Sequence, residues 1–489
     1  MNRREFMTGA FGLAGVVGAG SLLKGCAFPA PHGAFCGGTP NLRFGVLSDI
    51  HLKNPGDEKH LLNALRYFRD HGADGVLVAG DIADTGRIPQ LKMLADAWYS
   101  VFPGDRRPDG GHVEKLFVYG NHCLEGWPWN KLPEADAPKD SIGYGDNRAR
   151  VWEEFFHEKY EPIWMKKVRG YTFIGAHWKD GNHVDIEEFM KAHGGEIDPD
   201  RPFFYTQHAH LKDTCFGAWA WGHDDGSSTR ALSKFPNAVA FSGHSHYTLT
   251  DDRSVWQGAF TSINTSSLKY SSYDYSLRDN INGANMSGYH GDEKRPRPKP
   301  WIDRHSATGD GRQGMLISVY DDRMVIERRD FYYGFSLGED WVVPVPASET
   351  ADFSYAEQRR HRVAPEFPAG AAIAVGFDEE KDRREIGRVV TLSFPRAEEQ
   401  GGCHVFEYEI TAILEEDDVD LVQVQRRFIA PDFHLPFERK IASCRFSIPV
   451  NQLRLKGHYR FRAVPLESFG AKGRAIWSDL VVVSGDEQS

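Results

Sequence analysis

Short apolar runs recur along the earlier part of the chain, and several of them end abruptly in polar residues. They span residues 42–47, 75–79, 116–119, 203–206 and 238–241, and each has the length and composition of a buried β-strand. Residues 58–71 lie between the first two runs and place apolar side chains at helical spacing, as do residues 88–101. The order strand, helix, strand, helix, strand predicts parallel strand pairing with right-handed crossovers.

The later part of the chain has a different pattern. Residues 314–331 alternate apolar and polar positions around Asp321-Asp322, which predicts a hairpin that closes a first domain. After a mixed polar stretch come short strand-like runs at 371–375, 389–394, 405–414, 421–428, 440–448, 459–464 and 476–483. This spacing predicts a second, smaller all-β sandwich. Residues 457–464, followed by Phe469-Gly470, resemble the late strands of a fibronectin type III-like domain.

The N-terminal residues 1–25 have the pattern of an export signal. Arg3 and Arg4 precede an apolar, Gly-rich run at residues 10–23, which resembles a twin-arginine signal and is too short for a membrane-spanning helix. Residues 22–26 also look like a lipoprotein cleavage box, which would lipidate Cys26 and attach the protein to a membrane. The alternative is ordinary cleavage with Cys26 incidental. We therefore expect an exported protein, periplasmic or at the cell surface, with residues 26–40 as a Pro- and Gly-rich tether.

Composition limits the class of partner. Hydrophobic residues make up 40% and charged residues 26% of the chain, so there is ample material for packed domains. The net charge of −11 becomes −13 without residues 1–25, where Arg3, Arg4 and Lys24 outweigh Glu5 by two. Such an acidic protein is not expected to bind long nucleic acids, whereas a small phosphate ester remains suitable if metal ions supply positive charge. The sequence does not indicate an oligomeric state.

The polar residues that end the apolar runs are the candidates for chemistry. They are Asp49, His51, Asp81, Asn121, His122, His208, His244 and His246. Because ligands gather at the carboxyl ends of parallel strands, we expect these side chains to lie together. Carboxylate, amide and imidazole groups suit Mn, Fe or Zn better than Ca. Apart from His122, these residues offer seven ligands, which exceed the needs of one tetrahedral zinc site and suit two metal ions that share a bridging ligand.

The ordered set DxH, GD, GNH, a lone strand-end His and GHxH resembles the metallophosphoesterase superfamily, which includes the calcineurin-like phosphatases and phosphodiesterases. The resemblance covers roughly residues 42–333. It implies an α/β (α+β) fold in which a two-sheet β-sandwich is flanked by helices. We accordingly expect a catalytic domain at 41–345, a linker at 346–369 and the smaller all-β sandwich at 370–489.

The resemblance also implies a role for each candidate residue. Asp49, His51 and His246 would hold one metal, Asn121, His208 and His244 the other, and Asp81 would bridge the two. A hydroxide held between the metals would then attack phosphorus in line. His122 would stabilise or protonate the leaving-group oxygen, and Asp84 would orient its imidazole and raise its pKa. The alternative for Asp84 is the N-cap of the helix at residues 88–101.

Departures from the family pattern narrow the substrate class. Protein Ser/Thr phosphatases usually carry Arg where Thr85 stands and Glu where Cys123 stands, and purple acid phosphatases carry a Tyr ligand where Asp84 stands. A phosphomonoester and a phosphodiester both remain open. His177 is expected to be a packed core residue, and His210 to act behind the site at most. The rival hypothesis is a non-catalytic cell-surface binding protein that uses its C-terminal sandwich, but a complete ligand set favours the hydrolase.

Overall fold

The computed structural model describes residues 38–126, 138–179, 182–215, 224–272, 308–309, 311–346, 363–381, 386–416, 419–453 and 456–484. The residues from Pro40 to Ser489 form one compact unit. The expected export signal at 1–25, Cys26, and most of the tether and linker lie outside the described residues. Among the described residues, no helix is long and apolar enough to cross a membrane.

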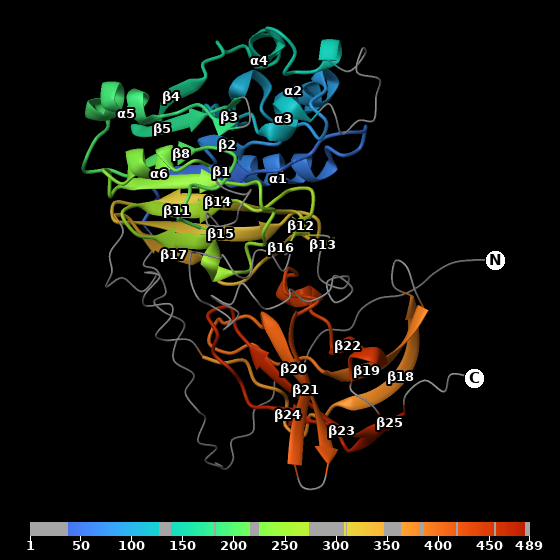
Figure 1. Cartoon of the computed structure of the whole chain (residues 1–489). Coiled ribbons are helices and arrows are strands. Elements are labelled where there is room, and N and C mark those ends of the chain that lie inside the picture. The colour runs from blue at the N-terminus through green and yellow to red at the C-terminus, as the bar shows by residue number, and fades with distance from the viewer. Residues whose placement is uncertain are drawn as a thin grey trace, which may run out of the picture. The chain divides into compact units, whose positions relative to one another are not determined.

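The first sheet of the N-terminal domain contains the earliest strands (Figure 1). Its order is β16-β15-β14-β1-β2-β3, with β17 also paired to β15. The strands are β1 (Leu42–Leu47), β2 (Gly75–Ala79), β3 (Glu114–Val118), β14 (Gln313–Val319), β15 (Arg323–Asp330), β16 (Phe335–Ser336) and β17 (Trp341–Pro344). β1, β2 and β3 pair in parallel, as predicted, and β14 and β15 form the predicted antiparallel hairpin.

The second sheet has the order β10-β11-β9-β8-β5-β4. Its strands are β4 (Ile163–Val168), β5 (Tyr171–Ala176), β8 (Phe203–Thr206), β9 (Ala238–Ser242), β10 (Val255–Gln257) and β11 (Thr261–Asn264). β5, β8, β9 and β11 pair in parallel with one another, whereas the edge strands β4 and β10 pair antiparallel with β5 and β11. Two small ribbons lie outside both sheets, β6 (Trp178–Lys179) with β7 (Asn182–His183), and β12 (Ser271–Ser272) with β13 (Thr308–Gly309).

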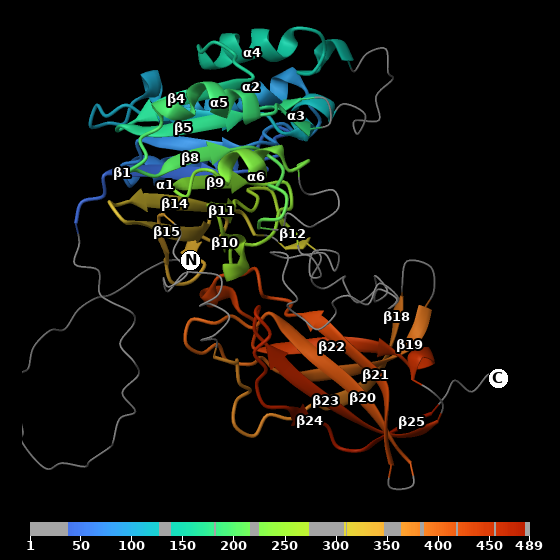
Figure 2. The ribbon, with the colours of Figure 1, turned by 60° about the vertical axis from the view of Figure 1, so that its left-hand side comes forward.

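Three apolar clusters show how the layers stack. The central cluster joins the inner faces of both sheets, for example Phe44 and Val46 of β1 with Phe204 of β8. An outer cluster packs α1 (Lys59–Asp70), α2 (Ile88–Val101) and α4 (Asn147–Phe156) against the first sheet, and another packs α5 (Glu187–His193) and α6 (Ser227–Leu232) against the second. Figure 2 shows these helices on the outside of the strands. The predicted two-sheet sandwich flanked by helices is therefore confirmed.

The regular structure of the C-terminal region consists mainly of two β-sheets, in agreement with the predicted all-β class. One sheet has the order β18-β19-β22 and the other β21-β20-β23-β24, with β25 paired to β23. The strands are β18 (Ala374–Lys381), β19 (Ile386–Pro395), β20 (Glu407–Glu416), β21 (Val419–Ile429), β22 (Ser443–Pro449), β23 (Gly457–Leu466), β24 (Ile476–Trp477) and β25 (Val481–Val483). One apolar cluster joins both sheets. The last predicted run, 476–483, is divided between β24 and β25.

Candidate metal centre

The candidate ligands lie at the carboxyl ends of strands from both sheets of the N-terminal domain. Asp49 and His51 follow β1, and Asp81 follows β2. Asn121 and His122 begin α3 (Asn121–Glu125), directly after β3 and a short turn. His208 follows β8, while His244 and His246 follow β9. Because β1 and β2 are parallel neighbours in one sheet and β8 and β9 in the other, the polar residues reach the same edge of the sandwich.

The backbone at these strand ends is unusual. A left-handed φ occurs at five of the candidate ligands, namely Asp49 (49°), His51 (48°), Asp81 (47°), His244 (68°) and His246 (54°). For a residue with a side chain this conformation costs about 1–2 kcal/mol. Such strain clusters at functional sites, where the surrounding structure holds the side chains in place.

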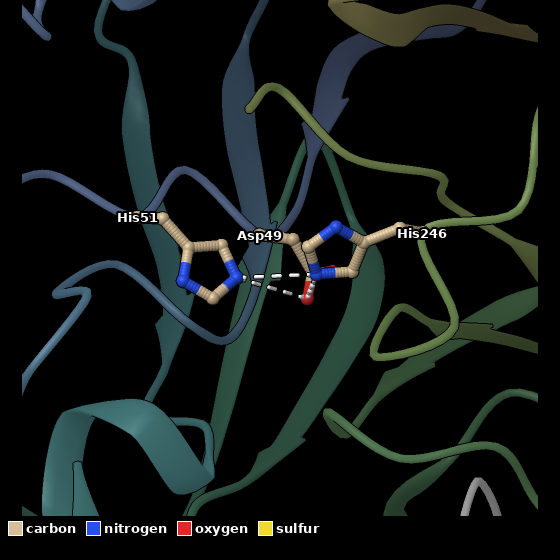
Figure 3. Close-up of side chains that lie close together, drawn as sticks. All are labelled: Asp49, His51 and His246. Carbon is tan, nitrogen blue, oxygen red and sulfur yellow. Dashed lines mark hydrogen bonds and ion pairs between the residues drawn. The ribbon is translucent and has the colours of Figure 1, made fainter. Parts of the chain in front are cut away.

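Asp49, His51 and His246 form the first group of potential metal ligands (Figure 3). His246 Nε2 lies 3.0 Å from Asp49 Oδ1, and 3.1 Å from His51 Nε2. His51 Nε2 lies 3.8 Å from Asp49 Oδ1. All three side chains are buried, so a cation among them would be shielded from water. The sequence placed these three residues on one metal by resemblance, and the structure brings them together.

Asp81, His208 and His244 form a second, adjacent group. His208 Nε2 lies 3.0 Å from Asp81 Oδ2 and 3.1 Å from His244 Nδ1. Asp81 Oδ2 is also 3.8 Å from His51 Nε2 of the first group. Asp81 therefore lies between the two groups, the position that a bridging ligand requires.

Neighbouring groups fix which atom each ligand presents to the site. Asp49 Oδ2 accepts hydrogen bonds from Ser48 Oγ (2.5 Å) and from the His244 amide (3.0 Å), which turns Oδ1 toward the histidines. His208 Nδ1 donates to the carbonyl oxygen of Ala79 (2.8 Å), so Nε2 carries the lone pair. Such contacts set the tautomer and orientation of metal-binding histidines.

The charges of the carboxylates and imidazoles perturb each other strongly. Burial alone would lower the pKa of His51, but Asp49 and Asp84 outweigh it and raise this pKa to about 9. Burial likewise opposes the charges of Asp81 and Asp49, which raise the pKa of His208 to about 9. Burial would raise the pKa of Asp49, yet His246 and His208 hold it well below the usual range. The positive charges of the protonated histidines balance the negative charges of the carboxylates, as the charge of a bound metal cation would.

The donor set fits metal ions. Asn121 Oδ1 is buried without a hydrogen-bond partner, although such an atom is costly to bury. Two pairs of imidazole nitrogens face each other at 3.1 Å, His51 with His246 and His208 with His244. Nitrogen atoms at this distance need a proton or a cation between them. Divalent cations would satisfy the amide oxygen and both nitrogen pairs.

Asp84 contacts a metal-ligand candidate as well as His122. Its carboxylate lies 3.2 Å from His51 Nδ1 and 2.8 Å from Lys53 Nζ. His122 Nδ1 donates to the backbone carbonyl oxygen of Asp84 (2.6 Å). Burial lowers the pKa of His122 despite the opposing charge of Asp81, whereas the family resemblance implied a raised pKa. Asp84 is not the N-cap of α2, which is Arg87.

His122 also belongs to a third group of potential metal ligands, with His51 and Asp81. Its backbone N–H donates to Asp81 Oδ1 (2.8 Å), and its ring meets the His51 ring edge-on at 4.5 Å. A role as a ligand and a role toward substrate therefore need to be separated by experiment.

Other polar residues lie behind the site. His210 contacts Ser242 Oγ (2.9 Å) and Ser245 Oγ (2.8 Å), and so supports the segment that carries His244 and His246. His177 is confirmed as a core residue: it is buried among aromatic rings and accepts a hydrogen bond from the Tyr119 amide (3.0 Å).

Sequence reasoning missed Tyr270, whose ring lies 4.4 Å from that of His246. It also missed Ser267, whose Oγ donates to the carbonyl oxygen of Asp49 (3.0 Å). The only signal for either residue was its place in an aromatic segment without periodicity.

Comparison with known proteins agrees with this site. Residues 42–248 match the family model of calcineurin-like phosphoesterases. This segment carries every candidate ligand, and it is a calcineurin-like phosphoesterase domain. With its groups of potential divalent-metal ligands, the protein is a metal-dependent phosphoesterase.

No curated protein matches the chain. Similar solved structures include a conserved protein of Streptococcus pneumoniae TIGR4 described as a predicted phosphoesterase, with 11% identity and a TM-score of 0.27, covering 62% of this chain and 97% of that one. GAP50 of Plasmodium has 10% identity and a TM-score of 0.34, covering 65% of this chain and 93% of that one. PhoD has 12% identity and a TM-score of 0.34, covering 60% of this chain and 66% of that one. Similarities this distant do not define a substrate.

Proposed function

We propose that this protein is an exported phosphoesterase that uses two metal ions to hydrolyse a small phosphomonoester or phosphodiester, with His122 assisting the leaving group. One observation carries the proposal. Two groups of buried ligands, Asp49-His51-His246 and Asp81-His208-His244, lie side by side with Asp81 between them. A single ion would leave one of the groups without a cation. Mn, Fe and Zn are the metals that this donor set suits.

The residues of the chain have separate tasks in this proposal. Asp49, His51 and His246 hold one metal, Asn121, His208 and His244 hold the other, and Asp81 serves both. When bound, the metals supply Lewis-acid activation of water and of the phosphoryl group.

His122 supplies a proton to the leaving oxygen. Because a carbonyl oxygen can only accept, the hydrogen bond to Asp84 keeps one proton on Nδ1, and a second proton on the ring resides on Nε2.

The test combines metal analysis with hydrolysis of synthetic esters. The full-length protein is stripped of metal, reloaded with Mn and assayed on p-nitrophenyl phosphate and bis-p-nitrophenyl phosphate. We expect two metals per chain at saturation, and activity that disappears with a chelator and returns with metal. His246→Ala is expected to lose one metal, whereas Asp81→Ala loses both because it serves both groups.

A control variant outside the site shows whether a substitution by itself disturbs the fold or the activity. His193→Ala changes an exposed histidine that pairs with Glu196 outside the site, and it is expected to behave like the wild type. Hydrolysis of neither ester by a protein with both metals bound would contradict the proposal and favour a non-catalytic binding protein. A single metal at saturation would contradict the dinuclear assignment.

A further inference from the structure

Four aromatic rings form a continuous row across the candidate metal centre. His122 meets His51 at 4.5 Å between ring centroids, His51 meets His246 at 5.0 Å, and His246 meets Tyr270 at 4.4 Å. The four residues come from four separate segments of the chain. His122 and Tyr270 are the two ends of the row, and each contacts a different histidine of the first group of ligands, His122 contacting His51 and Tyr270 contacting His246.

Tyr270 differs from the histidines of this row in its exposure. Its side chain is 39% exposed, whereas His51 and His246 are 3% and 6% exposed. One part of the ring thus packs on His246, and the rest is open to solvent. A partly exposed aromatic ring beside a polar centre offers an apolar surface to a ligand held at that centre.

Hydrogen bonds fix Tyr270 relative to the metal ligands. Ser267 Oγ accepts the amide N–H groups of Lys269 (2.9 Å) and Tyr270 (3.2 Å), and donates to the carbonyl oxygen of Asp49. The amide of Leu268 donates to the carbonyl oxygen of Ser48 (3.0 Å). The segment that carries Tyr270 is therefore tied to the strand end that carries Asp49. A ring held in this way is organised before the substrate arrives.

We propose that Tyr270 is a specificity-determining residue that packs against the ester group which stays on phosphorus, and that the preferred substrate is a phosphodiester whose retained group has an aromatic or apolar face. This inference rests on the proposed function. In the proposed function His122 serves the leaving oxygen. Tyr270 packs on His246 and not on His51, the ring that His122 contacts, and its exposed surface is therefore assigned to the group that stays on phosphorus.

The bonds that change in this reaction do not involve Tyr270. The oxygen of water bonds to phosphorus, the bond from phosphorus to the leaving oxygen breaks, and the leaving oxygen takes a proton from His122. The proton that water loses passes to solvent, and solvent returns a proton to His122. The second ester bond stays intact. Tyr270 therefore affects only substrates that carry a second ester group, and a monoester has none.

Two synthetic esters isolate this contact. Bis-p-nitrophenyl phosphate and p-nitrophenyl phosphate have the same leaving group and differ in the retained aryl group. For Tyr270→Ala we expect kcat/KM on the diester to fall by about tenfold, mainly through KM, the usual effect of losing an aromatic contact. The monoester should change by less than about twofold, with both metals bound. Tyr270→Phe keeps the ring and should keep the wild-type preference.

The matched control is Tyr332→Ala, which removes a 50% exposed tyrosine that contacts His60 and Tyr333 outside the site. It should leave both substrates unchanged. Equal losses on the two esters for Tyr270→Ala, or loss of metal, would overturn the inference by showing a structural role behind His246. A wild-type enzyme that hydrolyses only the monoester would overturn the inference alone. Hydrolysis of neither ester would overturn the proposed function itself.

Discussion

At the scale of single residues, His122 could serve either as a metal ligand or as the proton donor to the leaving group. It lies near His51 and Asp81 as a ligand would, yet its Nδ1 is held by a backbone carbonyl. If it serves the leaving group, His122→Ala should leave both metals bound while kcat falls by about 10²–10⁴, the usual effect of positioned acid catalysis. The loss should be larger for an alkyl ester than for a p-nitrophenyl ester, since a nitrophenolate needs little protonation. Elemental analysis with rates on both esters checks this. Lower metal content, with equal losses on both esters, would identify a ligand instead.

Asp84 gives a second residue-scale prediction, because its carboxylate and its carbonyl oxygen contact different histidines. Asp84→Asn removes the charge that faces His51 Nδ1 and Lys53 but keeps the backbone carbonyl that holds His122. We expect weaker metal binding, by about 10–100-fold, as for other changes behind a metal-binding histidine. At saturating metal the dependence on the leaving group should stay that of the wild type. A change in that dependence would mean that the carboxylate acts on His122 after all.

The histidines also predict how metal binding depends on pH. In the metal-free protein the carboxylates raise the pKa of both His51 and His208 to about 9, above the ordinary value of 6.5. A metal must displace these protons, so its affinity should rise with pH up to about 9 and then level off. The stability of the metal-free fold should show the opposite trend. The contribution of the protonated histidines is complete below the unfolded-state pKa and is lost as pH rises through the folded-state pKa. Chelator competition and thermal unfolding at several pH values measure both, and a flat affinity between pH 7 and 9 would contradict the assignment.

At the scale of elements, the strands and helices were predictable because burial leaves a plain pattern in the sequence. β1, β2 and α2 have the predicted bounds, since each is a run of apolar residues with clear polar limits. The candidate ligands could be proposed for the same reason, because they are polar residues that directly follow such runs. The backbone conformation at each strand end and the contacts of Asp84 could not be predicted from the sequence. They depend on left-handed φ angles at Asp49, His51 and Asp81, which leave no periodic signal. Tyr270 was missed because no strand or helix of clear pattern precedes it.

The turn after β9 gives an element-scale prediction. Gly243 lies where a Cβ would come within 2.0 Å of Ser48 Oγ and 2.3 Å of Asp49 Oδ2, the pair that orients Asp49. Gly243→Ala should therefore destabilise the protein by about 1–3 kcal/mol and weaken metal binding, because Asp49 must move. Gly195→Ala is the control, since a Cβ there meets nothing within 4 Å. Denaturant unfolding and metal titration of both variants test this, and equal behaviour of the two would show that the turn tolerates the methyl group.

At the scale of the whole molecule, we expect the all-β C-terminal region to contribute to stability rather than to chemistry. The groups of potential metal ligands in the described part of the chain all lie in the N-terminal domain. The C-terminal apolar cluster nevertheless includes Tyr247, the residue after His246. Gln313 Nε2 donates to the carbonyl oxygen of His434 (2.9 Å), while Gln313 Oε1 accepts the amide N–H of Leu249 (2.7 Å). The segment that follows the last ligand is thus packed against C-terminal residues.

A chain that ends at Pro346 should therefore fold less stably, and bind metal more weakly, than the full chain. Truncation would expose Tyr247 and remove Phe406, whose ring lies 4.3 Å from the Arg253 guanidinium. Phe406→Ala in the full chain isolates this contact and should cost about 3–5 kcal/mol of stability, the usual loss for a buried Phe, without changing the number of metals at saturation. Val422→Ser, at a 60% exposed position of β21, is the control and should be neutral. Thermal unfolding and metal stoichiometry decide the outcome.

A truncated protein as stable as the full chain would show that the N-terminal domain folds independently. A stable, metal-loaded truncated protein that is inactive on p-nitrophenyl phosphate would instead show that C-terminal residues take part in the reaction.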